Sequence, residues 1–243
     1  MIRRAFLACL LALATGAVAQ SPEPKALRVL FIGNSLTYTG DIPGRLAKLA
    51  AAMGRKATVE TVAFADFSLE DHWRDGRALA AIRSGWDVVV LQQGPSSQRD
   101  SRAQLVEYAK RFAKPIREAG AKPALYMVWP FVDRMRDFAG SIGAYREAAS
   151  AVDGILLPVG EAWLRAISVD KRLRLYSDTI HPASLGGDLA VLTMYLTLFP
   201  AGPQEFDETF VTRAARSLEI PAERRDLLFD AATRAIDEPM TLK

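Results

Sequence analysis

The segment RVLFIGNSLTYTGDIPGRL, residues 28–46, carries the features that decide the fold. Its residues 29–32 form an apolar run that is too short for a helix and typical of a buried strand. A glycine turn with Ser35 follows, and Pro43 then stands where the first turn of a helix tolerates proline. The segment therefore predicts a strand, a turn and a helix, with a serine at the corner. That serine could act as a helix cap, as part of a phosphate-binding turn or as a nucleophile.

Further apolar runs of the same kind recur along the chain, at 57–62, 87–92, 123–129 and 154–159. The stretches between and after them have helical spacing, at 42–53, 68–85, 101–120, 140–154 and 184–199. Strands that alternate with helices favour a parallel sheet covered on both faces. We therefore predict an α/β fold, a three-layer α/β/α sandwich around a five-stranded parallel sheet. Because ligands bind beyond the carboxyl ends of such strands, Ser35 should face a ligand.

The N-terminus has the pattern of a secretory signal peptide over residues 1–19. Arg3 and Arg4 precede an apolar run over 5–14, and Ala17-Val18-Ala19 offers a cleavage site. The run is well short of the roughly 20 residues that span a bilayer, so no membrane anchor should remain after cleavage. We expect an exported protein, periplasmic or secreted, by the general secretory route; the paired arginines keep the twin-arginine route open.

The remaining chain is expected to be a flexible lead over 20–26 and a single domain over 27–243. Its end, 203–237, reads as two helices broken near Pro221. The only cysteine, Cys9, lies in the signal peptide, so the mature chain has neither a disulfide nor a thiol nucleophile. Without the signal peptide, 29 basic and 28 acidic residues leave a charge of about +1. No basic run accompanies it, which argues against a nucleic-acid partner.

A second motif, YSDTIHPASLGG at 176–187, contains Asp178 and His181. A serine hydroxyl needs a base to become nucleophilic, and a histidine oriented by a carboxylate provides one. The D-x-x-H spacing lets Asp178 reach Nδ1 of His181 while Nε2 points outward. The other histidine, His72, lies inside a predicted helix and is expected to be a packing residue. Two histidines without cysteine also argue against a zinc site, and no cofactor is expected.

The two motifs together resemble those of the SGNH (GDSL-type) hydrolases. FIGNSLT is similar to the family's first block, which holds the nucleophile after the first strand, and SDTIHP is similar to its last block, D-x-x-H-P. The resemblance implies a flavodoxin-like SGNH fold over nearly all of the mature chain. It also implies Ser35 as nucleophile, His181 as base and Asp178 as the acid that orients it.

The middle blocks depart from the family and indicate a divergent branch. The family's second block supplies a glycine N–H to the oxyanion hole, but the loop AFADFSL, 63–69, contains no glycine. Asp66 is the best positional match, because aspartate tolerates the left-handed conformation. LQQGPSS, 91–97, replaces the third block, G-x-N-D. We expect the oxyanion hole to use the N–H groups of Ser35 and Asp66 with Gln93 or Gln92, while Gly94 and Ser96 could instead replace the family's glycine and asparagine.

The function predicted on this basis is that of an exported serine ester hydrolase. Its substrate is expected to be a small ester or a glycan ester with a short acyl group, acetyl first. Some of the aromatic side chains after strands two and four are expected to offer faces for sugar rings, and at least half of the four are expected in the core instead: Phe64, Phe67, Trp129 and Phe131. Two alternatives stay open at this point, a non-catalytic carbohydrate-binding protein with the same fold and an acyltransferase with the same triad.

Overall fold

A computed structural model of the chain describes residues 25–199 and 207–241. Its strands form one sheet, and every neighbouring pair is parallel. The order across the sheet is β2-β1-β3-β4-β5. The predicted five-stranded parallel sheet is therefore confirmed, with these bounds: β1 Leu27–Gly33, β2 Ala57–Ala63, β3 Val88–Leu91, β4 Lys122–Tyr126 and β5 Ile155–Leu157.

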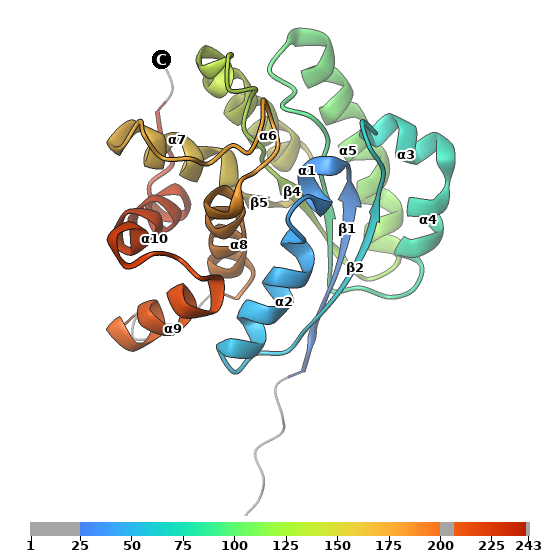
Figure 1. The fold of residues 1–243 in the computed structure, drawn as a ribbon. Coiled ribbons are helices and arrows are strands. Elements are labelled where there is room, and N and C mark those ends of the chain that lie inside the picture. The colour runs from blue at the N-terminus through green and yellow to red at the C-terminus, as the bar shows by residue number, and fades with distance from the viewer. Residues whose placement is uncertain (1–24, 200–206, 242–243) are drawn as a thin grey trace, which may run out of the picture.

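Helices cover both faces of the sheet, which confirms the three-layer sandwich (Figure 1). One face carries α2 (Ile42–Ala52), α8 (Ser184–Leu198), α9 (Glu208–Leu218) and α10 (Ala222–Asp237). The other carries α3 (Leu69–Asp75), α4 (Arg77–Ile82), α5 (Arg99–Glu118) and α6 (Phe138–Ala151). The remaining helices are α1 (Ser35–Tyr38), the 3₁₀ turn η1 (Met135–Asp137) and α7 (Val159–Val169).

The central strands are buried because helices pack on both of their faces. Residues 29–32 of β1 and residues 89–91 of β3 have no exposed surface. A continuous apolar run suits such strands, since no side of the strand faces water. Next to the sheet, the rings of Trp129 and Trp163 stack with centroids 3.5 Å apart. This core fixes the ends of β1, β3 and β4, from which the loops of the candidate site emerge.

Two details of the helix prediction need correction. The predicted helix over 68–85 is split into α3 and α4, because Gly76 between them has a φ of 83° that ends the first helix. Ser68 and Asp71 form a capping box at the start of α3. Helix α7 had no counterpart among the predicted helices.

The C-terminal part forms two helices, α9 and α10, with Pro221 as the N-cap of the second. Leu228 and Ala231 of α10 are buried against the core. The predicted signal peptide over 1–19 and most of the lead over 20–26 lie outside the described residues and stay predictions. Within the described ranges, no helix combines the length and apolarity needed to cross a membrane.

Candidate active site

Ser35 begins α1, directly after the carboxyl end of β1. The preceding residue, Asn34, caps this short helix by accepting a hydrogen bond from the N–H of Leu36 at 3.1 Å. Its amide also donates to the carbonyl of Phe67 at 3.1 Å, which ties the Ser35 turn to the loop after β2. Gly33 is required here, because an added Cβ would lie 2.3 Å from Oγ1 of Thr37. The local sequence thus builds a rigid corner that presents the serine.

Ser35, His181 and Asp178 form a hydrogen-bonded chain, although residues 35 and 181 are far apart in sequence. His181 Nε2 lies 2.9 Å from Ser35 Oγ, and His181 Nδ1 lies 2.7 Å from a carboxylate oxygen of Asp178. The loop that carries the last two residues enters α8, which packs beside α2. The geometry is that of a nucleophile, a base and a residue that orients the base. The structure thus brings together the three residues that the sequence singled out; their catalytic roles stay predictions.

The carboxylate of Asp178 is ionised at neutral pH. Main-chain N–H groups of Ile180 and His181 donate to it at 2.8 and 2.7 Å, and these bonds, with that of the imidazole, lower its pKa to about 2. An ionised carboxylate can only accept hydrogen bonds, so Nδ1 of His181 must carry the proton. The neutral ring then has a free lone pair on Nε2, which can take the proton of Ser35.

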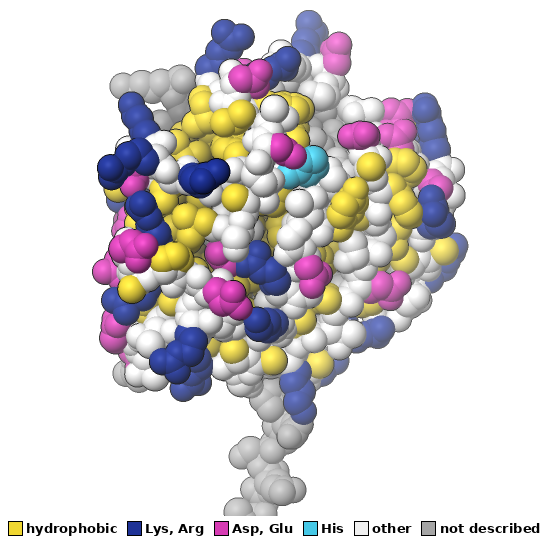
Figure 2. Space-filling view, in the orientation of Figure 1, with side chains coloured by type: hydrophobic (Ala, Val, Ile, Leu, Met, Phe, Trp, Pro, Cys, Tyr) yellow, Lys and Arg dark blue, Asp and Glu magenta, His cyan; other side chains and the backbone are white. Residues whose placement is uncertain are grey.

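His181 lies at the surface, whereas His72 is fully buried. The histidine that appears on the molecular surface in Figure 2 is therefore His181, with apolar side chains on both sides of it. His72 donates from Nε2 to the carbonyl of Gly33 at 2.7 Å, and its Nδ1 has no hydrogen-bond partner among the described residues. The rings of Phe64 and Phe67 enclose it, and burial lowers its pKa. The geometry agrees with the expected packing role.

Gln92 is part of the support beneath the Ser35 turn. Its side chain is fully buried and does not line the pocket beside Ser35. The amide group donates to Asn34 Oδ1 and to the carbonyl of Gln93, while its oxygen accepts from the N–H of Asn34 and from Thr37. The geometry therefore disfavours the expectation that Gln92 donates to an oxyanion, because both of its N–H bonds are directed elsewhere.

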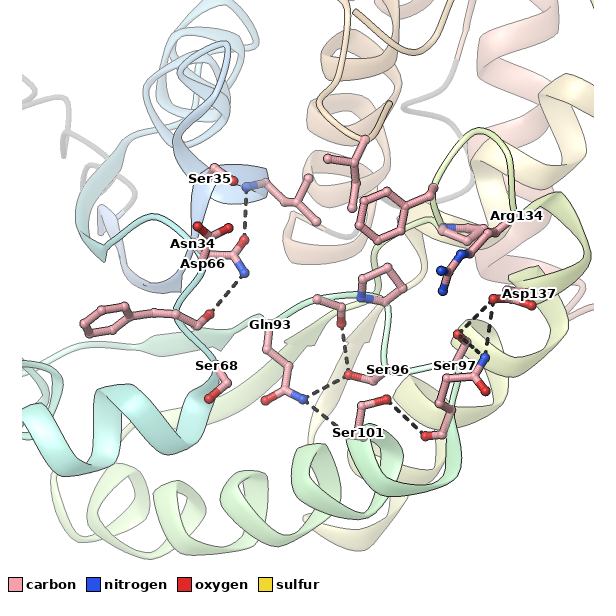
Figure 3. A pocket seen from close by; sticks show the side chains of 18 of the residues that line it. Asn34, Ser35, Asp66, Ser68, Gln93, Ser96, Ser97, Ser101, Arg134 and Asp137 are labelled. Carbon is pink, nitrogen blue, oxygen red and sulfur yellow. Dashed lines mark hydrogen bonds between the residues drawn. The ribbon is translucent and has the colours of Figure 1, made fainter. Parts of the chain in front are cut away.

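Gln93 lines the pocket, but its side chain is also engaged. Its amide donates to Ser96 Oγ at 3.0 Å and to the carbonyl of Ser101 at 3.3 Å, and its oxygen accepts from the N–H of Leu69. In Figure 3 it points toward Ser96 and Ser101, away from Ser35. Donation to a substrate would require this amide to leave its present partners. Its predicted place in an oxyanion hole stays a prediction.

Main-chain groups are available where the sequence predicted them. The N–H groups of Ser35 and Asp66 donate no hydrogen bond within the described part of the chain. Asp66 has a φ of 61°, the left-handed conformation that its position in place of glycine requires. Both residues line the same pocket. These two N–H groups are candidates to stabilise the developing negative charge of an ester oxygen.

The pocket has a volume of about 430 Å³ and opens beside the triad (Figure 3). Of the four aromatic residues expected at this rim, Phe67 and Phe131 line it, whereas Trp129 is fully buried in the core. Phe64 is absent from the lining and stacks under a guanidinium instead. The sequence prediction missed several polar lining residues from the segments after β3 and β4, which include the first turns of α5 and the 3₁₀ turn η1: Ser97, Gln98, Ser101, Gln104, Arg134 and Asp137. Loop sequence alone does not reveal which side chains turn inward.

No group of three or more potential metal ligands occurs among the residues that the structure describes. The potential ligands are His, Cys, Asp and Glu side chains. The expectation that the protein needs no cofactor stays a prediction.

Comparison with known proteins found relatives by structure. No protein-family model and no curated protein matches the chain. A proposed SGNH hydrolase from Slackia heliotrinireducens is 28% identical with a TM-score of 0.61, over 72% of this chain and all of that one. A DUF4886 family protein from Bacteroides uniformis is 19% identical with a TM-score of 0.68, over 90% of this chain and 98% of that one. Axe2, an acetylxylan esterase from Geobacillus stearothermophilus studied as a catalytic mutant, is 14% identical with a TM-score of 0.56, over 74% and 96% of the two chains.

The fold defines the class of protein. The five-stranded parallel sheet with helices on both faces matches the α/β fold of the proposed SGNH hydrolase from Slackia heliotrinireducens. The resemblance inferred from the sequence is thereby confirmed, and the neighbours support a divergent SGNH-type family.

Proposed function

We propose that this protein is an exported serine esterase of the SGNH type that removes short acyl groups, acetyl first, from carbohydrates or small esters. The observation that carries the proposal is the continuous hydrogen-bonded chain from Ser35 through His181 to Asp178. Neighbours that include hydrolases and esterases add support for ester hydrolysis. Export rests on the N-terminal sequence pattern alone.

In the proposed reaction, Ser35 Oγ attacks the ester carbonyl while His181 Nε2 takes its proton. The carbonyl oxygen becomes negatively charged beside the N–H groups of Ser35 and Asp66. His181 then gives the proton to the leaving alcohol, and an acyl-serine forms. Water, activated by the same histidine, releases the acid and restores the serine. Asp178 stays ionised throughout and stabilises the imidazolium.

The short-acyl, carbohydrate part of the proposal is supported by the lining of the pocket. Serine and glutamine side chains line much of its wall, with Phe67 and Phe131 as apolar faces. Hydroxyl and amide groups suit the hydroxyls of a sugar, and the aromatic faces suit its ring. We expect faster hydrolysis of p-nitrophenyl acetate than of the palmitate, and acetate release from acetylated xylan or chitosan oligomers. Faster turnover of the palmitate, or no acetate from any glycan, would contradict this part.

A non-catalytic carbohydrate-binding protein is the second candidate. The engaged amides of Gln92 and Gln93 favour it, because they leave no evident side-chain donor for an oxyanion. A fluorophosphonate probe separates the two candidates, since labelling requires both a nucleophile and a working base. We expect the wild type to be labelled at Ser35 and Ser35→Ala not to be labelled. An unlabelled wild type that binds glycans would favour the second candidate.

An acyltransferase would use the same triad and differ only in the acceptor. Adding an alcohol or a sugar acceptor to the ester assay and measuring the transfer product separates the two activities.

A further inference from the structure

Arg134 lines the pocket on the side opposite Ser35 (Figure 3). Its guanidinium has no carboxylate partner within ion-pair distance among the described residues. Most of the other arginines that the structure describes do have one; Arg77, for example, lies 2.6 Å from Asp75. A cation without a counter-ion inside a pocket is a ready binding group for an anion.

The acidic residues of the pocket do not neutralise Arg134. Asp137 accepts hydrogen bonds from Ser97 Oγ and Gln98 Nε2, each at 3.4 Å, and lies 3.9 Å from the exposed Arg136. Asp66 lies beside Asn34 on the Ser35 side of the pocket (Figure 3). The pocket therefore has an available positive group at the end away from the nucleophile.

The loop that carries Arg134 is fixed to the loop of the triad. The N–H of Val132 donates to the carbonyl of Thr179 at 2.9 Å, and Trp129 Nε1 donates to the carbonyl of Ile180 at 2.7 Å. Arg134 itself packs over the ring of Phe131, with its guanidinium carbon 5.8 Å from the ring centroid. The backbone that carries Arg134 is thus fixed relative to the His181 loop, and the contact with Phe131 keeps the exposed guanidinium on the pocket side.

We propose that Arg134 binds an anionic group of the substrate, a carboxylate on the sugar that carries the acyl ester. The proposal rests on the proposed esterase function and names its substrate class. A planar guanidinium matches a carboxylate through two parallel hydrogen bonds. An acetyl group at Ser35 fills only a small part of a pocket of about 430 Å³, so room for an acidic sugar ring remains. Ser97, Gln98 and Ser101 then lie along the wall beside the ring hydroxyls.

The direct test uses two esters that differ only in charge, acetylated methyl glucuronoside and acetylated methyl glucoside. We expect the wild type to have about tenfold higher kcat/KM for the acidic ester, mainly through KM, because a charge-assisted hydrogen bond contributes at this level. The preference should shrink as salt is added, since Arg134 is exposed. In Arg134→Gln the ratio of the two kcat/KM values should fall to about one, and Arg134→Lys should keep part of it.

Arg136→Gln is the matched control, because Arg136 is in the same loop but its side chain is 92% exposed and does not line the pocket. This variant should keep the wild-type ratio. A ratio near one in the wild type, or a ratio that Arg134→Gln leaves unchanged, would overturn the proposal. If p-nitrophenyl acetate is still hydrolysed in that case, the proposed esterase function stands.

A binding measurement makes the test independent of turnover. Calorimetric titration of Ser35→Ala with each ester should give about tenfold tighter binding of the acidic one, and the double variant with Arg134→Gln should lose the difference. Equal affinities would overturn the proposal even for a protein without activity. If the wild type is not labelled by the fluorophosphonate but the acidic ester still binds more tightly than the neutral one, only the esterase function is contradicted.

Discussion

The two histidines of the described chain lie in opposite environments. The His181 side chain is 30% exposed at the mouth of the pocket, and each of its ring nitrogens faces a side chain that can exchange or attract a proton. His72 has no exposed surface. One of its nitrogens donates to a main-chain carbonyl, and the other has no partner.

The comparison shows that the partners of an imidazole decide what it can do. A carbonyl oxygen accepts a hydrogen bond but has no proton to exchange, so the bond to Gly33 keeps a proton on Nε2 of His72, while burial lowers the pKa and favours the neutral ring. The hydroxyl of Ser35 can lose its proton, and the Asp178 carboxylate stabilises the charge that results on His181. One histidine therefore supports the fold beneath the Ser35 turn, and the other is available for chemistry.

The largest expected effect is the loss of turnover in His181→Ala. Because triad members act as a unit, kcat for p-nitrophenyl acetate should fall by about 10⁴-fold or more in this variant. In Ser35→Ala, kcat should fall by a similar factor. The melting temperature should change little, since the His181 side chain is partly exposed. Steady-state kinetics together with thermal unfolding measure both quantities.

The matched control is His72→Ala, for which kcat/KM at a temperature well below unfolding should stay within about threefold of the wild type. An inactive His72→Ala protein that is still folded, beside an active His181→Ala protein, would reverse the assignment of the two histidines.

A smaller loss is expected for Asp178→Asn. Asparagine still accepts the main-chain bonds of Ile180 and His181, so the loop keeps its shape. Its amide donates to the imidazole instead of accepting, which favours the wrong tautomer of His181 and removes the negative charge. We expect kcat to fall by about a hundredfold or more, yet by less than in His181→Ala. Equal activity of Asp178→Asn and wild type would show that the carboxylate does not orient the base.

Sequence reasoning was successful where local pattern carries the information. The strands appear as short apolar runs between helical stretches, and GNS and D-x-x-H each lie within one turn of chain, so both the sheet and the candidate triad could be predicted. The direction of a loop side chain depends on contacts with distant elements. It could therefore not be predicted from the local sequence. Gln92 turns under Asn34 because Asn34, the N-cap of α1, and Thr37 in α1 offer it hydrogen-bond partners. No feature of the LQQGPSS sequence indicates that choice.

The same limit explains the errors at the rim. Trp129 and Phe131 are two residues apart, and the sequence could not tell which of them faces the pocket: Trp129 stacks on Trp163 in the core, and Phe131 reaches the pocket. Arg134 and Asp137 were missed because a loop of polar residues has no periodicity that tells inward from outward.

His72→Ala should lower stability much more than activity. The variant removes a buried ring between Phe64 and Phe67 and leaves the carbonyl of Gly33 without its donor. A cavity together with a lost buried hydrogen bond costs about 2–4 kcal/mol of unfolding free energy. His72→Phe, which keeps the volume but not the donor, should lose about 1–2 kcal/mol. Denaturant unfolding of the three proteins at pH 7 measures the series, and equal stabilities would contradict the packing role.

The smallest expected effect is the pH dependence that His72 gives to stability. Burial lowers the pKa of this histidine below its value of about 6.5 in an unfolded chain. The unfolded chain therefore binds a proton on His72 at a higher pH than the native protein does. The stability that His72 contributes is fully present above about pH 6.5 and is lost as the pH falls toward the lowered value. The slope cannot exceed about 1.4 kcal/mol per pH unit.

Asp188 has the opposite influence on stability in the same pH range. Burial raises its pKa to about 6 despite the ion pair with Arg45. Its contribution to the free energy of unfolding therefore falls as the pH rises. Both the wild type and His72→Phe contain Asp188. The contribution of Asp188 therefore cancels when the unfolding free energies of the two proteins are subtracted. We expect the difference to increase in favour of the wild type between pH 5 and pH 7 and to be constant above pH 7.5. Denaturant unfolding at half-unit steps of pH measures it. A difference that stays constant across the whole range would mean that His72 does not titrate differently in the two states, and the contrast with His181 would then rest on hydrogen-bond partners alone.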